Sequence, residues 1–282
     1  MIKGIIGVVG GGTMGRGIAQ SFLQAGYEVI ITDKDSTKIK SAREYILKGI
    51  DKIVELEKIS KEEGKTYKGN LACSDSISSL INAIAVIEAV NENLGLKQEL
   101  FRELDALTGE DTILASNTST LSIDEIAEKT NNKERVIGMH FFVPAEKMKL
   151  VEVIPGINTG NEIVSRTMDL LNGISKSPVL CEDTPGFIVN RLFLLFENEA
   201  MRMFDEKVAS KEDIDNAIRL GLNHKMGPLE LADLVGLDVI FNALTSLFEA
   251  TKDIKFKPSS ILSELVNKNY LGQKTGKGFY NY

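Results

Sequence analysis

Short apolar runs alternate with helical patterns over the first two thirds of the chain. The run "GIIGVVGGG" at 4–12 is continuously apolar and ends in glycines, which is typical of a buried parallel strand. Apolar runs that predict further strands occupy 27–33, 83–90, 112–116, 135–141, 149–154 and 178–182. Apolar residues at helical spacing lie between most of them, at 14–26, 96–107, 122–130 and 161–174. This alternation predicts an α/β domain with a doubly wound sheet.

One interval between strands holds more helix than a simple crossover needs. Residues 36–60 carry apolar side chains at 39, 42, 46, 50, 53 and 56, which is the spacing of a long amphipathic helix with Ser36 as the expected N-cap. The sequence "SKEE" at 60–63 is a capping box for a second helix. We therefore predict a helical arm that protrudes over about residues 36–70.

The arm segment is also rich in charge. Residues 34–68 contain ten Lys or Arg and seven Asp or Glu, a local charge of +3 on a chain whose net charge is −7. A solvated helix face explains such a pattern. A site for a polyanionic ligand explains it as well, and the charges alone leave both interpretations open.

Strand patterns end after residue 182. From "TPGFIVNRLFLLFENEAMRMF" onward the pattern is helical, at 186–205, 210–220, 227–251 and 259–268, with Pro228 at an expected helix start. This change predicts two domains. The first is the α/β domain over 1–183 and the second is an all-α domain over 184–282.

Composition excludes several classes of function. The net charge of −7 argues against nucleic acid as a general partner. No apolar run reaches the ~18 residues of a membrane span, and the first residues are typical of a strand, not of a signal peptide. Cys73 and Cys181 form no disulfide framework, and no Cys/His cluster has metal-ligand spacing. We expect a cytoplasmic protein without a metal site.

A glycine-rich loop links the first predicted strand to the first predicted helix. Its spacing is G-x-G-x-x-G, and an acidic residue ends the second strand, which is the arrangement of a dinucleotide-binding unit. That carboxylate would accept hydrogen bonds from the adenosine ribose and repel a 2′-phosphate, which favours NAD(H) over NADP(H). The alternative is a glycine turn that binds nothing. The predicted cofactor contacts of this segment are Gly10, Gly12, Thr13, Met14, Gly15 and Asp33.

The chain has two histidines, and one of them is a candidate acid–base group. His140 ends a predicted strand, and Glu152 lies inside the next one, so the two can face each other across a short turn. Histidine suits proton transfer to and from an alcohol, and a carboxylate on its second nitrogen fixes the tautomer. The alternative is a structural core histidine. His224 lacks a carboxylate in apolar surroundings and is expected at a helix end or a domain contact.

The motifs taken together resemble a known family. "GGGTMGRGIAQ", "ASNTSTLSI", "GMHFF-P---MKLVEVI", "TPGFIVNR", "MGPLELAD.VGLD" and "GQKTGKGFYNY" are similar to the L-3-hydroxyacyl-CoA dehydrogenases, above all the short bacterial 3-hydroxybutyryl-CoA type. The resemblance implies a Rossmann-like domain with a helical arm, a helical domain that forms a homodimer or higher homo-oligomer, and a role in fatty acid and butyrate metabolism. It also implies NAD-dependent interconversion of (S)-3-hydroxyacyl-CoA and 3-oxoacyl-CoA.

The resemblance also implies roles for single residues. His140 would be the acid–base group, with Glu152 as its partner. Ser119 would bond the 3-oxygen of the substrate, and Asn190 would bond the substrate near the thioester or that oxygen. The residues implied to contact NAD are Glu92, Lys97, Asn117 and Lys274.

The chain departs from the family pattern beside His140. Val143 stands where the family usually has Asn in "HFFNP", and Glu146 and Lys147 replace residues that are usually apolar or Pro-Val. Valine offers no hydrogen bond, and a bond left unmade at a buried amide costs about 1–3 kcal/mol. This substitution favours either a weakened family site or a rearranged pocket.

The arm departs from the family pattern as well. Asp51 and Glu55 stand where relatives tend to have Ser and Lys for the CoA 3′-phosphate. Two carboxylates would repel that phosphate, and the neighbouring Lys48, Lys52 and Lys58 could compensate. Lys48 and Lys52 are therefore the expected CoA contacts.

Three hypotheses follow. The leading one is a short-chain 3-hydroxyacyl-CoA dehydrogenase that binds NAD and an acyl-CoA. The second is a family relative that oxidises a 3-hydroxy acid without CoA, such as a sugar acid or a carnitine-like compound. The third is a catalytically weak NAD-binding protein with a structural or regulatory role, which the intact candidate site residues disfavour.

Overall fold

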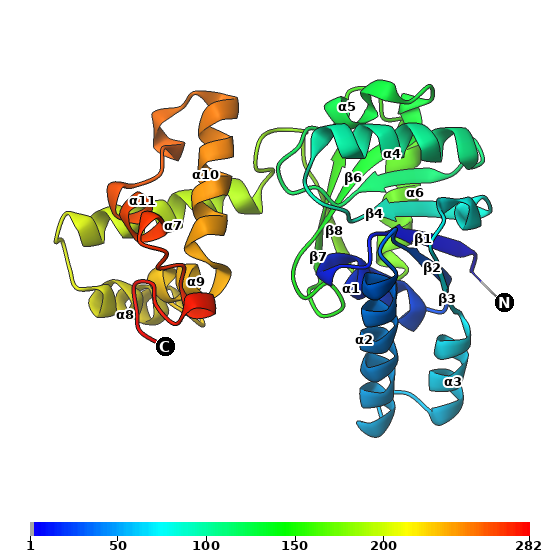
Figure 1. The fold of residues 1–282 in the computed structure, drawn as a ribbon, viewed down its shortest axis with the longest axis horizontal. Coiled ribbons are helices and arrows are strands. Elements are labelled where there is room, and N and C mark those ends of the chain that lie inside the picture. Colours follow the sequence, from blue (N-terminus) through cyan, green and yellow to red (C-terminus); the bar gives the residue numbers. More distant parts are fainter. Residues whose placement is uncertain (1–2) are drawn as a thin grey trace. The chain divides into compact units, whose positions relative to one another are not determined.

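The computed structural model describes residues 3–282, and the chain divides into two compact units, Met1–Thr184 and Pro185–Tyr282. Figure 1 shows strands in the first unit, here the N-terminal unit, and helices in the second, here the helical unit. The division falls one residue after the predicted boundary at 183. Strand patterning along the sequence therefore changes where the chain passes from one unit to the other.

A single eight-stranded sheet forms the N-terminal unit. The spatial order is β3-β2-β1-β4-β5-β6-β7-β8, and all neighbouring strands are parallel except β6 and β7, which are antiparallel. Sequence patterning missed β3, which is a four-residue edge strand with too few residues for a period to show. The strands are β1 (Ile5–Val9), β2 (Glu28–Thr32), β3 (Leu71–Ser74), β4 (Ala83–Glu88), β5 (Ile113–Ser116), β6 (Val136–Phe141), β7 (Leu150–Pro155) and β8 (Ser177–Leu180).

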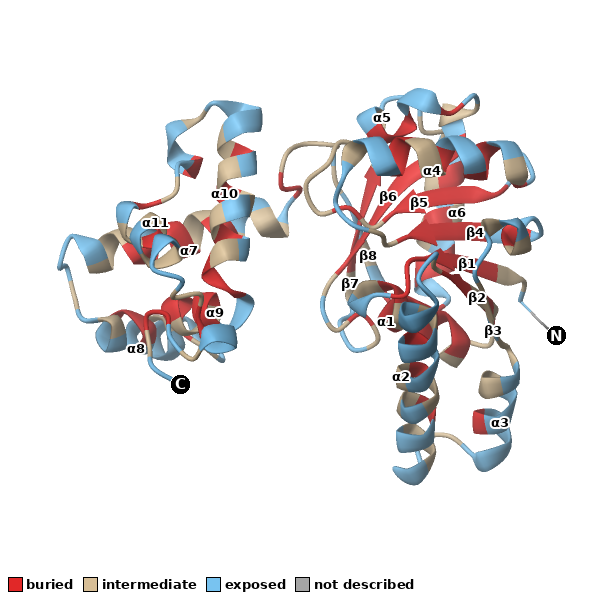
Figure 2. Ribbon diagram, in the orientation of Figure 1, coloured by how far each residue is buried: buried red, intermediate tan, exposed pale blue. Residues whose placement is uncertain are grey.

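Helices cover both faces of the sheet, and Figure 2 shows its central strands buried between them, while the edge strands β3 and β8 are more exposed. Side chains alternate along each strand, so that Ile137, Met139 and Phe141 of β6 join the core on the face that packs against α1 and α6. The intervening residues face α4 and α5. The helices are α1 (Thr13–Gln24), α4 (Leu94–Leu107), α5 (Ile123–Ile126) and α6 (Asn161–Asn172), with short 3-10 turns η1 (Ile77–Leu80), η2 (Ala127–Lys129) and η3 (Lys133–Arg135).

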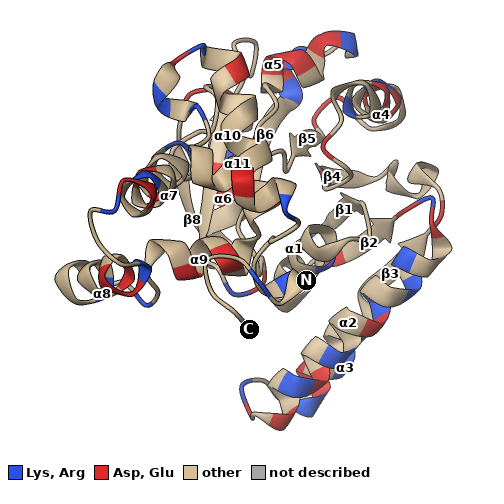
Figure 3. Cartoon of the chain, turned by 60° about the vertical axis from the view of Figure 1, so that its left-hand side comes forward, with Lys and Arg blue, Asp and Glu red and all other residues tan. Residues whose placement is uncertain are grey.

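The helical arm consists of α2 (Ser36–Glu55) and α3 (Lys61–Gly69), which extend away from the sheet in Figure 1. The predicted N-cap Ser36 is wrong by one residue. Asp35 caps α2, because its Oδ1 accepts hydrogen bonds from the backbone N–H and the hydroxyl of Thr37. The predicted capping box of α3 is confirmed, with Ser60 and Glu63 bonded to each other's backbone N–H groups. Basic and acidic residues are interspersed along both helices (Figure 3).

The helical unit has its own apolar core, drawn from all five of its helices. The single helix predicted over 227–251 is wrong. The chain breaks at Gly236, which has φ +108°, a value that favours glycine over other residues. The unit contains α7 (Val189–Asp205), α8 (Lys211–Leu222), α9 (Pro228–Val235), α10 (Leu237–Thr251) and α11 (Ser260–Asn267), with turns η4 (Ile254–Phe256) and η5 (Gln273–Thr275). Within residues 3–282 no single helix could span a membrane, and α9 with α10 meets the length and apolarity test only as a pair bent by 96°.

Candidate active site

A different physical reason explains glycine at each of the three positions of the phosphate loop. Gly10 has φ +113°, and a Cβ there would lie 2.4 Å from the carbonyl oxygen of Ala89. A Cβ on Gly15 would lie 1.8 Å from the carbonyl oxygen of Gly10, so α1 can approach β1 only without a side chain. Gly12 has no neighbour within 4 Å of such an atom. The space in front of Gly12 is therefore open to a ligand.

The N-terminus of α1 faces this open space. Gly12 is its N-cap and supplies no side-chain bond to the first backbone N–H groups, and Thr13 and Met14 form the first turn. Backbone N–H groups at a helix N-terminus, together with the helix dipole, attract a phosphate. This end of α1 therefore suits a pyrophosphate.

Asp33 lies directly after β2, at the carboxyl edge of the sheet. Its Oδ2 accepts the backbone N–H of Gly11 at 2.8 Å, and its Oδ1 accepts that of Asp35 at 2.9 Å. The carboxylate also lines a cleft of about 370 Å³ in front of the loop, with Gly10, Gly12, Val90, Leu96 and Leu100 among the other lining residues. Each carboxylate oxygen retains a lone pair that a ribose hydroxyl could use.

These features together fit NAD. The apolar side of the cleft suits adenine, Asp33 suits the ribose diol, and the α1 N-terminus suits the pyrophosphate. Six predicted cofactor residues, from Gly10 to Asp33, therefore lie around one cleft and loop.

His140 and Glu152 form a buried pair. The antiparallel register of β6 and β7 places the two residues directly opposite each other, and His140 Nδ1 lies 2.6 Å from Glu152 Oε2. Both side chains point to the face opposite the α1–α6 core, since their strand neighbours join that core. His140 is 5% exposed and Glu152 is 0% exposed. The carboxylate thus fixes the imidazole with Nδ1 toward it and Nε2 away from it.

A buried ion pair lies on the same face, at the ends of β4 and β5. Glu88 accepts hydrogen bonds from Lys97 Nζ at 2.6 Å, from Ser116 Oγ at 2.6 Å and from the backbone N–H of Val90 at 2.7 Å. Glu88 and Ser116 are directly paired across the sheet, and Lys97 reaches them from α4. Because Lys97 is only 1% exposed, its charge is compensated within the protein.

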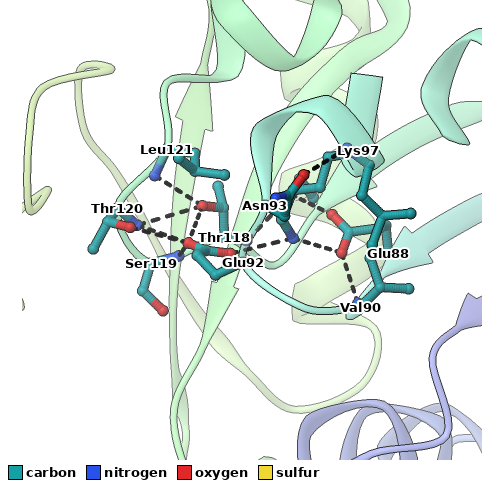
Figure 4. A network of polar contacts seen from close by, with 11 residues as sticks. Glu88, Val90, Glu92, Asn93, Lys97, Thr118, Ser119, Thr120 and Leu121 are labelled. Carbon is teal, nitrogen blue, oxygen red and sulfur yellow. Dashed lines mark hydrogen bonds and ion pairs between the residues drawn. The ribbon is translucent and has the colours of Figure 1, made fainter. Parts of the chain in front are cut away.

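Glu92 connects this ion pair to the turn that carries Ser119 (Figure 4). Its Oε2 lies 3.3 Å from Lys97 Nζ, and its Oε1 accepts the backbone N–H of Ser119 at 2.9 Å and the hydroxyl of Thr118. Burial alone would raise the pKa of Glu92, but Lys97 and these hydrogen bonds outweigh it and hold the pKa below its usual range. Glu92 therefore stays ionised and holds Ser119 in place.

Asn117 joins the same group of residues. Its Oδ1 accepts the backbone N–H of Phe141 at 2.9 Å, and its own backbone N–H donates to the carbonyl of Glu88. The Asn117 side chain thereby ties the end of β5 to the strand end that carries His140. Val143 lies three residues further on and is 64% exposed within the chain.

Three other predicted residues belong to the helical unit. Asn190 is the second residue of α7, and Lys274 lies in η5 and forms an ion pair with Asp238 of α10, so both belong to the helical unit. His224 follows α8, is exposed, and has its ring 5.9 Å from that of Phe196, as expected of a histidine at a helix end.

The arm lysines Lys48 and Lys52 are exposed on α2. Asp51, which lies between them in the sequence, forms an ion pair with Lys68 of α3. The negative charge of Asp51 is thus compensated by a lysine that the sequence reasoning did not consider. Its repulsion of a phosphate on the arm is correspondingly reduced.

Sequence reasoning missed Glu88, Ser116 and Thr118. A signal was present, because Glu88 stands inside the apolar run 83–90 just as Glu152 stands inside 149–154. A carboxylate in a buried strand requires a partner. Ser116 and Thr118 flank Asn117 at the end of the neighbouring strand, where the carboxyl ends of a doubly wound sheet gather ligand-binding residues.

The fold and this group of side chains define an NAD-binding oxidoreductase. Residues 5–184 match the family model "3-hydroxyacyl-CoA dehydrogenase, NAD binding domain", and residues 186–282 match "3-hydroxyacyl-CoA dehydrogenase, C-terminal domain". The chain belongs to the 3-hydroxyacyl-CoA dehydrogenase family, which confirms the resemblance, the fold class, the enzyme class and NAD as the cofactor.

Similar proteins agree over the whole length. The chain is 40% identical to a 3-hydroxybutyryl-CoA dehydrogenase of Clostridioides difficile, over 98% of this chain and 99% of that one. It is 40% identical to the human mitochondrial hydroxyacyl-coenzyme A dehydrogenase, over 98% and 90%. The crystal structure of (S)-3-hydroxybutyryl-CoA dehydrogenase from Ralstonia eutropha superposes with a TM-score of 0.96 at 37% identity, over 99% and 98% of the two chains.

Proposed function

We propose that the protein interconverts (S)-3-hydroxybutyryl-CoA and acetoacetyl-CoA with NAD as the oxidant of the alcohol. The observation that carries this proposal is the buried His140–Glu152 pair, with its 2.6 Å contact, on a chain whose residues 5–184 match an NAD-binding dehydrogenase domain. The short-chain substrate is supported by similar proteins of the same length that are named 3-hydroxybutyryl-CoA dehydrogenases.

His140 is proposed as the acid–base group. Nδ1 faces Glu152, so Nε2 is the nitrogen that would take the hydroxyl proton during oxidation and return it to the ketone oxygen during reduction. The Glu152 carboxylate stabilises the imidazolium formed in the oxidative direction. When bound, NAD supplies the hydride acceptor.

Ser119 and Asn190 are proposed to hydrogen-bond the substrate oxygens. The Ser119 backbone is held by Glu92, and Glu92 is held by Lys97, so the hydroxyl sits on a turn with a fixed position. Glu92 also remains our candidate for a contact with the nicotinamide ribose. Asn117, Lys97 and Lys274 remain candidates for contacts with NAD, and Lys97 also holds Glu92 through their ion pair. Lys48 and Lys52 stay proposed contacts of the CoA phosphate.

NADH oxidation on addition of acetoacetyl-CoA tests the function. Replacing His140 with Ala should lower turnover about a hundredfold or more, because proton transfer by a positioned side chain contributes roughly 10²–10⁴-fold. The exposed His224→Ala is the matched control and should leave turnover within twofold. Unchanged turnover in the His140→Ala variant would contradict the assignment of His140 as the acid–base group.

A second candidate substrate class is a 3-hydroxy acid without CoA. Val143 in place of the usual Asn and the acidic Glu55 on the arm favour it. The pairing of Asp51 with Lys68 weighs against it, since this carboxylate is no longer an uncompensated charge on the CoA side. A higher kcat/KM for a free 3-oxo acid than for acetoacetyl-CoA would favour this second class.

We also propose a homodimer or larger homo-oligomer in the cytoplasm. The helical unit exposes large apolar side chains, with Leu192 at 65% and Leu220 at 85% exposure, and exposed apolar surface is a feature of association sites. Light scattering on the purified protein should give a mass of at least two chains. A mass of one chain at micromolar concentration would contradict the dimer.

A further inference from the structure

The loop after His140 is held from two sides. This loop, residues 142–149 and here the His140 loop, joins β6 to β7. The carbonyls of Ala145 and Met148 accept hydrogen bonds from the buried ammonium of Lys176, and the carbonyl of Ala145 also accepts from Ser21 Oγ of α1 at 3.3 Å. These bonds fix the inner side of the loop to the N-terminal unit.

The outer side of the loop contacts the arm. Tyr45 of α2 donates its hydroxyl proton to Glu146 Oε1 at 2.8 Å, across 101 residues of sequence. The Arg16 guanidinium of α1 lies 4.1 Å from the centre of the Tyr45 ring, in a cation–π contact. Within residues 3–282, no other side-chain hydrogen bond joins α2 or α3 to this loop. Three segments of the proposed site thus meet at one tyrosine.

Glu146 is half-buried between α1 and the arm. A Cβ on Gly17 would lie 2.9 Å from Glu146 Oε2 and 3.1 Å from Ala145 Cβ, so the loop packs directly against α1 at this glycine. Burial raises the pKa of Tyr45, and its bond to Glu146 raises it further, so the phenol keeps the donated proton at neutral pH. The contact is therefore a directed, charge-assisted hydrogen bond.

The helix face that carries Tyr45 also carries the arm lysines. Tyr45, Lys48 and Lys52 are spaced three and four residues apart, which places them on one side of α2. At the other end of the contact, the His140 loop carries Phe142, whose ring centre lies 4.6 Å from that of His140. The Tyr45–Glu146 bond thus lies between the groups proposed for the two ends of an acyl-CoA.

We propose that Tyr45 and Glu146 are positioning residues that set the separation between the arm lysines and His140, and so tune the site to a substrate with a full CoA handle. This inference rests on the proposed function. A shorter thioester without the adenine nucleotide does not span both ends and is indifferent to that separation. The contact therefore acts on recognition of CoA and leaves the hydride and proton steps unchanged.

Steady-state kinetics with two thioesters test this role. Tyr45→Phe removes the donated hydrogen bond and should raise KM for acetoacetyl-CoA about five- to tenfold, while KM for acetoacetyl-pantetheine, KM for NADH and kcat stay within twofold. Glu146→Ala should raise KM for acetoacetyl-CoA by a similar factor. The double variant should have a KM no higher than that of the more affected single variant. Glu146→Gln keeps an acceptor oxygen and should restore most of the affinity.

The matched control is Tyr67→Phe, because Tyr67 is a half-buried tyrosine of α3 on the same arm whose hydroxyl contributes no bond to the loop. It should leave both KM values unchanged. Equal rises of KM for both thioesters in Tyr45→Phe would show a general structural defect and overturn the proposal.

Amide hydrogen exchange separates failure of this inference from failure of the proposed function. If the wild-type protein reduces neither thioester, the proposed function fails. Hydrogen exchange still tests whether the Tyr45–Glu146 bond holds the His140 loop. Tyr45→Phe should speed exchange in residues 142–149 at least fivefold and leave exchange in β6 unchanged. Unchanged exchange in that loop would overturn the positioning role whatever the substrate.

Discussion

Buried carboxylates have different surroundings in the two units. In the N-terminal unit, Glu88 is 0% exposed and accepts three hydrogen bonds, one of them from Lys97. In the helical unit, Glu197 of α7 is also 0% exposed, but neither of its oxygens has a hydrogen-bond partner among the described residues. Burial raises the pKa of Glu197 well above its usual value. Glu88 is thus paired with a cation and two further hydrogen-bond donors, whereas burial at Glu197 favours the neutral acid.

The difference shows which of the two buried carboxyl groups supports the proposed site. Glu88 bonds Lys97 and Ser116, and Lys97 in turn contacts Glu92, which holds the turn of Ser119. The burial of Glu88 therefore supports the geometry of the proposed site. Glu197 lies on the core face of α7 beside Leu194 and Met201. Nothing in the structure explains the choice of glutamate there. The two carboxylates should therefore respond oppositely to substitution.

The largest effect on the free energy of unfolding is expected at the Lys97–Glu88 pair. Lys97→Met leaves Glu88 as an uncompensated buried charge and should lower the free energy of unfolding by about 3–5 kcal/mol. Urea unfolding followed by circular dichroism measures it. Combining Lys97→Met with Glu88→Leu should recover most of the loss, because an apolar pair replaces the ionic one. A loss below about 1 kcal/mol for Lys97→Met would contradict the role given to this pair.

A smaller change of opposite sign in the free energy of unfolding is expected at Glu197. Glu197→Met should raise the free energy of unfolding by about 1–3 kcal/mol at pH 8, because an unpaired buried polar group is removed. Since the folded-state pKa of Glu197 is raised, its stability contribution is fully present below the unfolded pKa of about 4.3 and is lost as pH rises through the folded pKa.

The gain from Glu197→Met should therefore grow with rising pH. Unfolding curves at pH 5, 6.5 and 8 measure it, and Glu197→Gln, which removes the titration but keeps the polarity, is the control. A gain that stays constant from pH 5 to pH 8 would show that the pKa of Glu197 is not raised in the folded protein.

The smallest effect is expected from an exposed pair. Asp51 and Lys68 join the two arm helices, but their side chains are 55% and 35% exposed. Solvent and salt weaken such pairs, so Asp51→Asn should change the free energy of unfolding by about 0–1 kcal/mol. The same urea experiment measures it, with Lys68→Met as the reciprocal variant. A loss above about 2 kcal/mol would mean that this pair resembles the buried one.

Periodic features of the fold could be predicted from the sequence. Strand period and glycine spacing located β1, the phosphate loop and the two adjacent strands that carry His140 and Glu152. These features depend on neighbours within a few residues, so a single segment contains the signal. Asp33 was found in the same way, from its fixed distance after the glycine loop.

Contacts between distant segments could not be predicted. The Tyr45–Glu146 bond spans 101 residues, and the Ser116–Glu88 bond spans 28, so nothing local marks either partner. The α9–α10 break was missed for a related reason. Apolar spacing continues through Gly236, and only the positive φ there shows that the helix ends.

The central claim is that the proposed site of His140 and Glu152 takes a 3-oxoacyl-CoA in preference to the free 3-oxo acid. Initial rates of NADH oxidation with acetoacetyl-CoA and with free acetoacetate, measured side by side on the wild-type protein, test it most directly. The account predicts a kcat/KM for acetoacetyl-CoA at least a hundredfold above that for acetoacetate. An equal or higher kcat/KM for the free acid would contradict it.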